Sequence, residues 1–358
     1  MNKILFFASD FKIGLSSLLT AQVCAFAQAG IMLHVASSAG EQEPGLHDRL
    51  KETGIEYTII ENLDAHEAFI QKARAIRQLM KTTDCTHVHV QNNWQLALVA
   101  CAKCGMRKAP KVIYSLHGFR HNHPIKAKIA KLVIGTALLL FADKVICMCR
   151  YLKREFSLLQ HKIALLPLGI DAAFFAPSPL PETKGLRIIF PAQFREGKNQ
   201  DLIIRAFADY LVQTGNEESH LTLPGSGPKL GEMKALVDSL GIIDRASFPG
   251  QCSKQQIVEL YKNSNVAVVA SNSETFGQSI VEPFAMGRIV VSRPVGIAPD
   301  IIQHGETGYL FLNQENLTAI FVEIDKDFPA SVADSAKRSA SIFQWNQIAV
   351  EYKEKILA

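Results

Sequence analysis

Residues 271–287 read SNSETFGQSIVEPFAMG and follow the apolar, β-branched run 266–270. Such a run has the composition of a buried parallel strand. Small and polar residues then lead to 278–286, which can begin a helix. A strand, a tight turn at Gly277 and a helix N-terminus would together place unpaired backbone N–H groups around one point. The stretch therefore predicts a phosphate-binding turn in an α/β fold.

Two carboxylates frame this turn. Glu274 lies in the loop and Glu282 inside the helix. Carboxylates are poor phosphate ligands but good acceptors for hydroxyl groups. A ligand with a diphosphate between two hydroxyl-bearing rings, such as a nucleotide sugar, would use both features. Two glutamates at this spacing also arise by chance, and a capped, solvated helix is the alternative interpretation.

Composition narrows the class of protein. The chain has 358 residues, is 48% hydrophobic and 20% charged, and carries a formal net charge of +4. It is long enough for two domains with cores of their own. The charge is too small to indicate nucleic-acid binding, although anionic phosphates or a membrane surface stay possible. No apolar run reaches transmembrane length, and the N-terminus resembles a first strand, so we expect a cytoplasmic protein.

The sequence does not favour a metal site. The seven cysteines lie mostly in apolar contexts and are expected to be reduced core thiols. Cys101 and Cys104 form a CxxC without a second pair, which favours packing inside a helix. His87 and His89 alternate onto one face of a strand, where satisfied core histidines are expected. The acidic Asp-x-Asp at 325–327 is assigned to the surface.

The first half of the chain alternates strands and helices. This pattern begins as a βαβ unit and predicts a parallel sheet with ligands beyond the carboxyl ends of its strands. His117-Gly follows one such strand directly, so we expect its ring to face a ligand. Strands are predicted at 3–8, 31–36, 57–60, 87–90 and 112–116, with helices at 18–29, 66–81 and 95–105.

Several motifs together resemble one family. Glu-Thr-Phe-Gly at 274–277, Ala-Met-Gly at 285–287 and the segments 289–292, 296–300 and 304–308 resemble the signature of the retaining family 4 glycosyltransferases. The resemblance covers most of the chain. It implies the GT-B architecture, in which two Rossmann-like domains face each other across a cleft. The acceptor-side domain would be 1–168 with the C-terminal helix 343–358, and the nucleotide-sugar domain would be 169–342.

The resemblance also assigns roles to residues. Glu282 would hold the ribose hydroxyls and Glu274 the hydroxyls of the donor sugar. Arg195 and Lys198 would take the diphosphate, with Arg195 replacing the arginine that the family usually has at the position of Gln193. The catalytic group would thus be Glu274, His117, Arg195 and Lys198. Further donor contacts are implied for Phe276, Gly277, Gln278, Ser279, Gly225 and Gln251, and a diphosphate and acceptor loop for Gly14 and Leu15.

The implied reaction moves a sugar from a nucleotide sugar, expected to be a UDP-sugar, to an acceptor hydroxyl without a metal or other cofactor. The acceptor expected by analogy is a lipid-linked or cell-surface glycan precursor, as in polysaccharide or lipopolysaccharide biosynthesis. Two alternatives stay open at this point. One is a sugar-nucleotide epimerase or hydrolase of the same architecture, and the other is a non-catalytic nucleotide-binding subunit.

A second signal lies at 120–142. Six basic residues precede the apolar run 132–142, which is too short to span a bilayer. This pattern suits a helix that lies at an anionic membrane surface, and thus peripheral attachment to the inner face of the cytoplasmic membrane. The alternative is a helix that packs its apolar face into the N-terminal domain and solvates its lysines. The six are Arg120, His121, His123, Lys126, Lys128 and Lys131.

Overall fold

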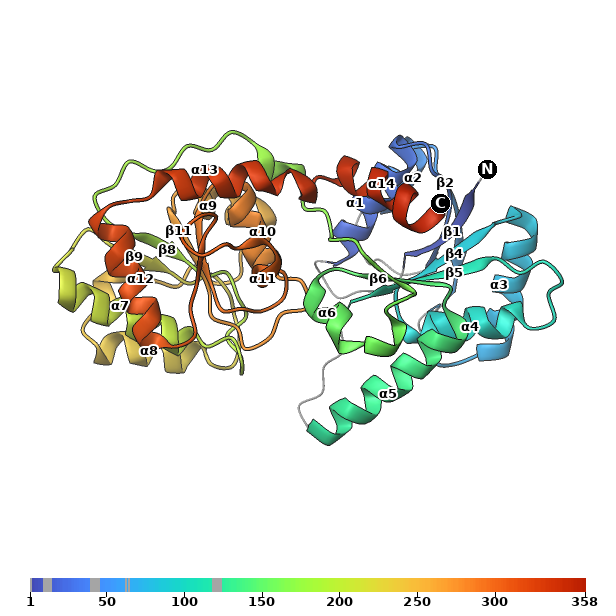
Figure 1. Cartoon of the computed structure of the whole chain (residues 1–358), viewed down its shortest axis with the longest axis horizontal. Helices are drawn as coiled ribbons and strands as arrows, with labels where there is room; N and C mark the ends of the chain where they lie inside the picture. Colours follow the sequence, from blue (N-terminus) through green and yellow to red (C-terminus); the bar gives the residue numbers. More distant parts are fainter. Residues whose placement is uncertain (1, 9–14, 39–45, 62, 64, 118–123) are drawn as a thin grey trace. The chain divides into compact units, whose positions relative to one another are not determined.

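The chain forms two compact units in the computed structural model, each built on one parallel sheet (Figure 1). The first unit comprises Met1–Gly169 with Phe343–Ala358, and the second comprises Ile170–Ile342. The structure describes residues 2–8, 15–38, 46–61, 63, 65–117 and 124–358. The C-terminal segment thus belongs to the unit in which the chain begins.

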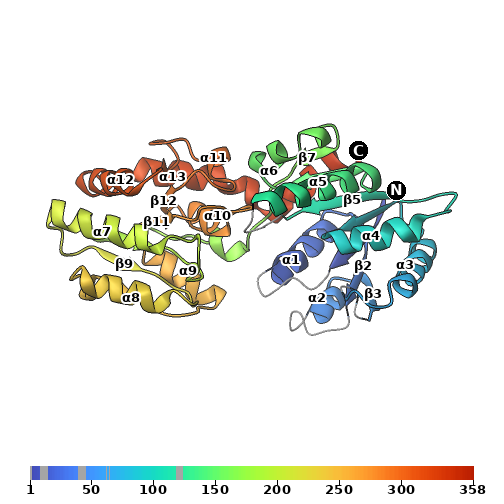
Figure 2. The same cartoon turned by 90° about the horizontal axis from the view of Figure 1, so that it is seen from below.

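The first unit holds a sheet of seven strands in the order β3-β2-β1-β4-β5-β6-β7. Helices α1 and α14 cover one face of this sheet and α3 and α4 the other (Figures 1 and 2). The strands are β1 (Lys3–Ala8), β2 (Met32–Ser38), β3 (Glu56–Ile60), β4 (His87–Val90), β5 (Lys111–Leu116), β6 (Lys144–Cys147) and β7 (Ile163–Leu165). The helices are α1 (Leu15–Gln28), α2 (Leu46–Glu52), α3 (Phe69–Thr83), α4 (Asn93–Lys103), α5 (Pro124–Phe141), α6 (Arg150–Glu155) and α14 (Trp345–Tyr352), with a short 3-10 helix η1 (Ser157–Leu159) and a short π-helix η5 (Lys353–Leu357).

The second unit repeats this plan with six strands in the order β10-β9-β8-β11-β12-β13. Its strands are β8 (Arg187–Ile189), β9 (His220–Thr222), β10 (Ala246–Ser247), β11 (Val266–Val269), β12 (Ile289–Ser292) and β13 (Tyr309–Leu310). The helices are α7 (Gln200–Thr214), α8 (Leu230–Ser239), α9 (Lys254–Lys262), α10 (Gln278–Ala285), α11 (Ala298–Ile301), α12 (Gln314–Lys326) and α13 (Ala330–Ser339). The short turns are η2 (Ala172–Phe175), η3 (Ile243–Arg245) and η4 (Ala340–Phe343).

The central strands are buried along their whole length, as strands covered by helices on both faces must be. All four residues of β4, β11 and β12 are buried. The predicted strand at 87–90 is confirmed, and so is the buried strand expected at 266–270, which ends at Val269. Helix α1 begins at Leu15, three residues before the predicted start at 18.

The two histidines of β4 are buried and hydrogen-bonded, as predicted for core histidines. His89 is fully buried, shares a hydrogen bond of 2.8 Å between its Nε2 and Ser115 Oγ, and has its pKa lowered to about 3 by burial. His87 is buried beside Thr86. All seven cysteines are free thiols, and three of them, Cys85, Cys147 and Cys149, are buried.

The strand orders create a switch point in each sheet. The chain leaves β1 toward β2 on one side and returns to β4 on the other, and β8 stands in the same way between β9 and β11. In open α/β sheets the loops that leave two such neighbouring strands diverge, which opens a crevice at their carboxyl ends. The loops after β8 and β11 are therefore where a ligand of the second unit is expected.

Candidate functional site

Lys198 and Glu274 meet at the switch point of the second unit. Lys198 lies in the loop after β8 and Glu274 in the loop after β11, seventy-six residues apart in sequence. The Lys198 Nζ lies 2.5 Å from Glu274 Oε1, and the two side chains are only 13% and 12% exposed. Both residues were candidates from sequence, and the fold brings them into contact. A cation and a carboxylate side by side can serve a ligand that carries both phosphate and hydroxyl groups.

An asparagine clamp holds the two loops together. Asn199 Nδ2 donates to the carbonyl of Ala270 at 2.8 Å and to Asn272 Oδ1 at 2.6 Å. The backbone N–H of Asn272 donates in turn to the carbonyl of Gly197 at 2.8 Å. Asn199 adopts the left-handed conformation with φ 53°, which asparagine tolerates better than most residues. The clamp fixes the backbone on both sides of Lys198, and sequence reasoning gave no role to Asn272.

The N-terminus of α10 opens beside this pair. Gly277 precedes the helix with φ 98°, and within the described chain no side chain caps the helix. The backbone N–H groups of Gln278 and Ser279 belong to the first turn, where the helix offers them no partner. Their dipoles and the macrodipole favour an anion at this end. The turn and uncapped helix N-terminus expected at Gly277, Gln278 and Ser279 are thus present, and phosphate binding there stays a prediction.

The loop after β12 packs against the turn that precedes α10. The Phe276 carbonyl accepts a hydrogen bond of 2.8 Å from the backbone N–H of Ile297. Gly296 lies so close that a Cβ there would come within 2.4 Å of the same carbonyl oxygen. Phe276 itself is buried. Its contribution to a ligand would therefore come from its backbone, as the family resemblance implies.

Glu282 sits in the second turn of α10 in an electrostatically unusual place. Burial raises the pKa of its carboxyl to about 8, the carboxylate of Asp171 adds to the rise, and Lys254 opposes it. Lys254 and Asp171 form their own ion pair, with Nζ and Oδ2 2.7 Å apart. The Glu282 carboxyl is therefore largely protonated near neutral pH, so it can both donate to and accept from a hydroxyl group.

Tyr261 is a neighbour of Glu282 that sequence reasoning missed. Its ring is fully buried, burial raises the pKa of its phenol well above the usual value, and the charge of Glu282 adds to that rise. In the part of the chain that the structure describes, its hydroxyl has no hydrogen-bond partner. No sequence signal marked Tyr261, Asp171 or Lys254, because three separate segments bring them to Glu282.

The glycine loop after β9 packs on the loop after β8. The backbone N–H of Gly225 donates to the carbonyl of Gly250 at 2.7 Å, next to Gln251. A Cβ on Gly225 would lie 2.0 Å from the Ala192 carbonyl oxygen. Gly225 and Gln251 thus stand on adjacent loops at the carboxyl ends of β9 and β10. The glycine at 225 therefore has a packing reason that is independent of any ligand.

Arg195 points to a different place from Lys198. Its Nη1 donates to the carbonyl of Glu196 at 3.4 Å. Its side chain lines a cavity of about 520 Å³ between α7 and α8, together with Lys229 and Glu232. Lys198 is not among the residues around that cavity. A joint role of Arg195 and Lys198 on one diphosphate stays a prediction.

His117 lies at the carboxyl end of strand β5 in the first unit. It follows β5, and its Nε2 lies 2.8 Å from the side-chain oxygen of Gln91, which follows β4. Because Gln91 Oε1 can only accept, Nε2 carries the proton. Burial lowers the pKa of His117 to about 4, so the ring is neutral near pH 7.

Of the diphosphate and acceptor loop predicted at Gly14 and Leu15, Gly14 lies outside the described residues, and Leu15 is the first residue of α1.

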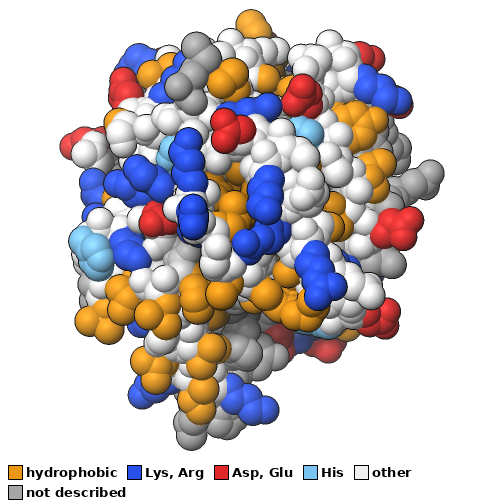
Figure 3. All heavy atoms as spheres, turned by 90° about the vertical axis from the view of Figure 1, so that its right-hand side faces the viewer, with side chains coloured by type: hydrophobic (Ala, Val, Ile, Leu, Met, Phe, Trp, Pro, Cys, Tyr) orange, Lys and Arg blue, Asp and Glu red, His pale blue; other side chains and the backbone are white. Residues whose placement is uncertain are grey.

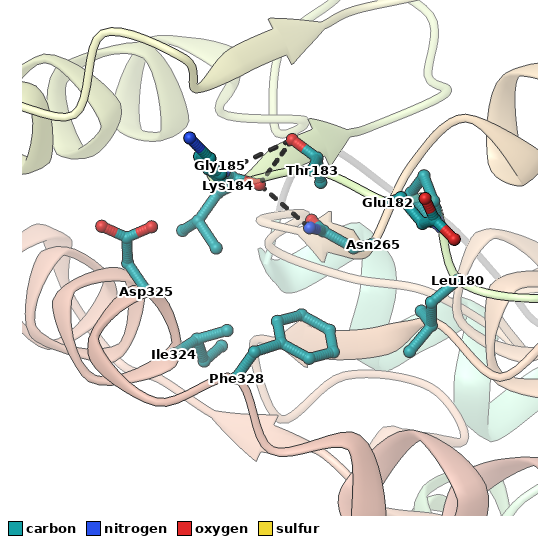
Figure 4. A pocket seen from close by; sticks show the side chains of 11 residues that line it. Leu180, Glu182, Thr183, Lys184, Gly185, Asn265, Ile324, Asp325 and Phe328 are labelled. Carbon is teal, nitrogen blue, oxygen red and sulfur yellow. Dashed lines mark hydrogen bonds between the residues drawn. The ribbon is translucent and has the colours of Figure 1, made fainter.

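A separate pocket of about 250 Å³ lies at the opposite ends of the second sheet (Figure 4). Gly185 and Asn265, which line it, precede β8 and β11. Asn265 Nδ2 donates to the Gly185 carbonyl at 3.1 Å, which shapes the turn before β8. Asp325 of α12 also lines this pocket and accepts hydrogen bonds from Asn216 at 2.8 and 3.0 Å. Asp325 therefore has a structural hydrogen-bonding role, half-buried rather than fully at the surface as predicted.

Within the described residues, no group of three or more His, Cys, Asp or Glu side chains comes together as a metal site would require.

Two family models match the chain in succession. Residues 14–174 match the model of Glycosyltransferase Family 4, and residues 172–326 match that of Glycosyl transferases group 1. The two matches together extend from residue 14 to residue 326, so the chain belongs to the family 4 glycosyltransferases. The N-acetyl-alpha-D-glucosaminyl L-malate synthase of Bacillus anthracis is 33% identical over 123 residues, which are 34% of this chain and 31% of that protein. The D-inositol 3-phosphate glycosyltransferase of Acidothermus cellulolyticus is 27% identical over 203 residues, 52% of this chain and 45% of that protein. The chain thus matches 31% and 45% of the length of these two curated relatives.

Solved structures resemble the whole chain. Anabaena HepE in complex with UDP aligns over 100% of both chains with a TM-score of 0.80 and 18% identity. The lipopolysaccharide outer core galactosyltransferase WaaB aligns over 99% of both with a TM-score of 0.73 and 17% identity. At these identities the likeness shows the fold, which is GT-B. The predicted α/β fold class and the family resemblance are confirmed.

Proposed function

We propose that this protein is a retaining glycosyltransferase that moves a sugar from a nucleoside diphosphate sugar to an acceptor hydroxyl. One observation carries the proposal: Lys198 and Glu274 are in contact at the switch point, beside the uncapped N-terminus of α10. This arrangement offers cationic, dipolar and hydroxyl-accepting groups to one ligand. Family membership supports it, and solved HepE, a protein of the same fold, binds UDP-glucose.

The chemistry that these groups can perform is leaving-group stabilisation. As the bond between the anomeric carbon and the phosphate oxygen breaks, negative charge grows on the departing diphosphate. Lys198 and the N–H groups of Gln278 and Ser279 would stabilise that charge in place of a metal ion. The acceptor oxygen would enter on the face that the diphosphate leaves, which retains the anomeric configuration. The departing phosphate oxygen would take the proton of the acceptor hydroxyl.

Glu274 would exchange partners when the donor binds. In the structure its carboxylate accepts a hydrogen bond from Lys198 at 2.5 Å. A diphosphate competes for Lys198, which frees the carboxylate to accept from the sugar hydroxyls. Glu282 would take the ribose hydroxyls. It lies in α10, the helix whose N-terminus would bind the diphosphate, and its side chain is half-buried. His117 is neutral and hydrogen-bonded to Gln91, and its role beside the donor sugar stays a prediction from the family resemblance.

We expect the acceptor to be a lipid-linked or cell-surface glycan precursor. The chain shares its fold with a lipopolysaccharide outer core galactosyltransferase, WaaB. A UDP-sugar is the donor to test first, because HepE was solved with UDP and with UDP-glucose.

Thermal unfolding in the presence of UDP, GDP, ADP and CMP, without added metal, tests the site. A nucleotide at about a hundred times its dissociation constant adds about 2.7 kcal/mol to the stability of the folded state. We expect UDP to raise the midpoint of the wild type. The Glu282→Ala variant should bind it more weakly by about 0.5–1.5 kcal/mol near neutral pH, since a hydrogen bond to a neutral carboxyl group is lost. An equal shift in wild type and variant would refute the ribose assignment.

The anomeric configuration of the product tests the reaction. Proton NMR of the product formed with a matched acceptor should show the configuration of the donor sugar. Inversion would contradict the proposed mechanism. Conversion of the nucleotide sugar at full rate without acceptor would indicate an epimerase or hydrolase instead.

A further inference from the structure

Helix α5 is apolar around most of its circumference and yet is largely exposed. Its eighteen residues read PIKAKIAKLVIGTALLLF. A helix that is hydrophobic all round normally lies in a protein core or in lipid. Here, among the large apolar side chains with described exposure, only Leu138 is fully buried. Those exposed by between 42% and 68% are Ile129, Leu132, Val133, Leu139, Leu140 and Phe141.

The exposed surface continues from α5 onto η1. Leu158 is 78% exposed. Between α5 and η1 lies a mainly apolar groove of about 290 Å³. Its walls include Leu132, Leu139, Phe156, Leu158 and Leu159, and Gly135 leaves room at its floor. The alternative that α5 packs its apolar face into the first unit is therefore wrong for most of this helix.

The charged side chains of helix α5 are all basic. Helix α5 carries Lys126, Lys128 and Lys131 and no acidic residue. Lys131 pairs with Glu155 at 2.9 Å, whereas Lys126 and Lys128 are exposed. In Figure 3 hydrophobic side chains gather on the lowest part of the face shown, at the height of α5 in Figure 1, with lysine or arginine side chains beside them. Of the candidates in the sequence, Arg120, His121 and His123 lie outside the described residues.

We propose that α5 and η1 form a docking face for an anionic lipid bilayer, with hydrocarbon entering the groove between them. The inference rests on the proposed function in one respect, since it places the acceptor in or on that membrane. Apolar side chains flanked by lysines match the interface of a bilayer that carries negative headgroups. A second copy of the chain would bring the same lysines against one another, which disfavours a dimer through this face. The described chain contains no helix long and apolar enough to cross a membrane, so α5 would lie along the surface.

Sedimentation of the full chain with vesicles tests the proposal. Vesicles contain phosphatidylglycerol and phosphatidylcholine, or phosphatidylcholine alone. We expect binding to the anionic vesicles that weakens with added salt. Leu132→Gln with Leu140→Gln should lower the partition coefficient by about tenfold or more, because two exposed leucines lose their transfer into hydrocarbon. Lys126→Gln with Lys128→Gln should lower it by about 25-fold on anionic vesicles only, at about fivefold per lysine.

A matched control lies in the second unit. Val212 and Leu312 are 86% and 66% exposed, so Val212→Gln with Leu312→Gln removes as much exposed apolar surface elsewhere. This variant should bind vesicles like the wild type. Equal binding by the Leu132/Leu140 variant, or no binding by the wild type, would overturn the proposal. So would a wild-type dimer in analytical ultracentrifugation that the Leu132/Leu140 variant abolishes.

The UDP-induced thermal shift separates this proposal from the previous one. The α5 variants should keep the shift, because they lie in the first unit and leave the nucleotide-binding residues unchanged. Vesicle binding without any nucleotide shift would remove the proposed function and leave the docking face in place. A nucleotide shift without vesicle binding would do the reverse.

Discussion

At the scale of single residues, the site consists of titratable side chains that are nearly or half buried. Lys198 and Glu274 are nearly buried and satisfy each other. Among the described residues Glu282 forms no ion pair, and burial raises the pKa of its carboxyl to about 8, so it is largely protonated near neutral pH. The phosphate and hydroxyl groups of a ligand can replace the contact between Lys198 and Glu274. The protonated carboxyl of Glu282 can hydrogen-bond to hydroxyl groups without carrying a full charge.

A double-mutant cycle tests the Lys198–Glu274 pair. Lys198→Ala and Glu274→Ala should each lower the free energy of unfolding by about 1–3 kcal/mol, because each leaves a nearly buried charge unpaired. The double variant should regain most of this loss. Urea unfolding followed by circular dichroism measures all four proteins. Strictly additive losses would show that the two side chains do not interact.

The pH dependence of stability tests the environment of Glu282. Its pKa rises from 4.5 to about 8 on folding, so between these values the folded protein holds a proton that the unfolded chain has released. Stability from this group is therefore full below pH 4.5 and declines as the pH rises toward 8. Glu282→Gln stays neutral and should exceed the wild type by roughly 1–3 kcal/mol at about pH 8.5, with little difference at about pH 5. Equal urea midpoints at both pH values would contradict the raised pKa.

At the scale of elements, close backbone approach positions the loops. The carboxyl ends of β8, β9 and β11 each lead into a loop that touches the next through backbone groups. Gly225 adopts φ 146° against the loop after β8, and Gly296 adopts φ 55° against the loop after β11. Side chains at these positions would push the loops apart, and with them the residues that should meet the ligand.

Gly225→Ala should therefore destabilise the second unit by about 2–4 kcal/mol, since its Cβ would lie 2.0 Å from the Ala192 carbonyl oxygen. It should also reduce the UDP-induced thermal shift. Gly231→Ala is the control: this glycine lies in α8 with open space around it, and alanine should stabilise the helix by about 0.5–1 kcal/mol. Thermal unfolding of the two variants side by side makes the comparison. Similar midpoints for both would mean that the loops adapt without cost.

At the scale of the whole molecule, the two ends of the chain share one core. Tyr352 of α14 is fully buried, its ring centre is 4.3 Å from that of Phe26, and its hydroxyl lies 3.0 Å from His89 Nδ1. Ile348 and Ala349 belong to the same cluster. The first unit therefore cannot complete its core until the second unit has been synthesised.

Tyr352→Ala should destabilise the first unit by about 3–5 kcal/mol, and Tyr352→Phe by about 1–2 kcal/mol through the lost partner of His89. Both tryptophans of the chain, Trp94 and Trp345, lie in the first unit, so their fluorescence follows its unfolding. Val350→Ala, at a side chain 50% exposed on the same helix, should change the midpoint by less than about 0.5 kcal/mol. An unchanged fluorescence midpoint for Tyr352→Ala would show that the C-terminal helix does not stabilise the first core.

The sequence alone determined the class of fold and the location of the main turn. Buried parallel strands are apolar along their whole length, and β11 and β12 could be recognised for that reason. Gly277 marked the start of α10 because few other residues adopt its backbone conformation. The motif at 274–287 indicated the family on local grounds. These features depend on near neighbours in the chain, which a sequence displays directly.

Only the tertiary structure decided which groups stand together. The Lys198–Glu274 contact, the Asn199 clamp and the surroundings of Glu282 join residues from loops that sequence spacing cannot relate. Strand order puts β8 beside β11, and that order follows from the packing of the whole unit. The exposure of α5 was likewise undecided by its apolar sequence, since a core helix and a membrane-facing helix can have the same composition. Contacts and burial arise from long-range packing, so they become visible only when the chain is folded.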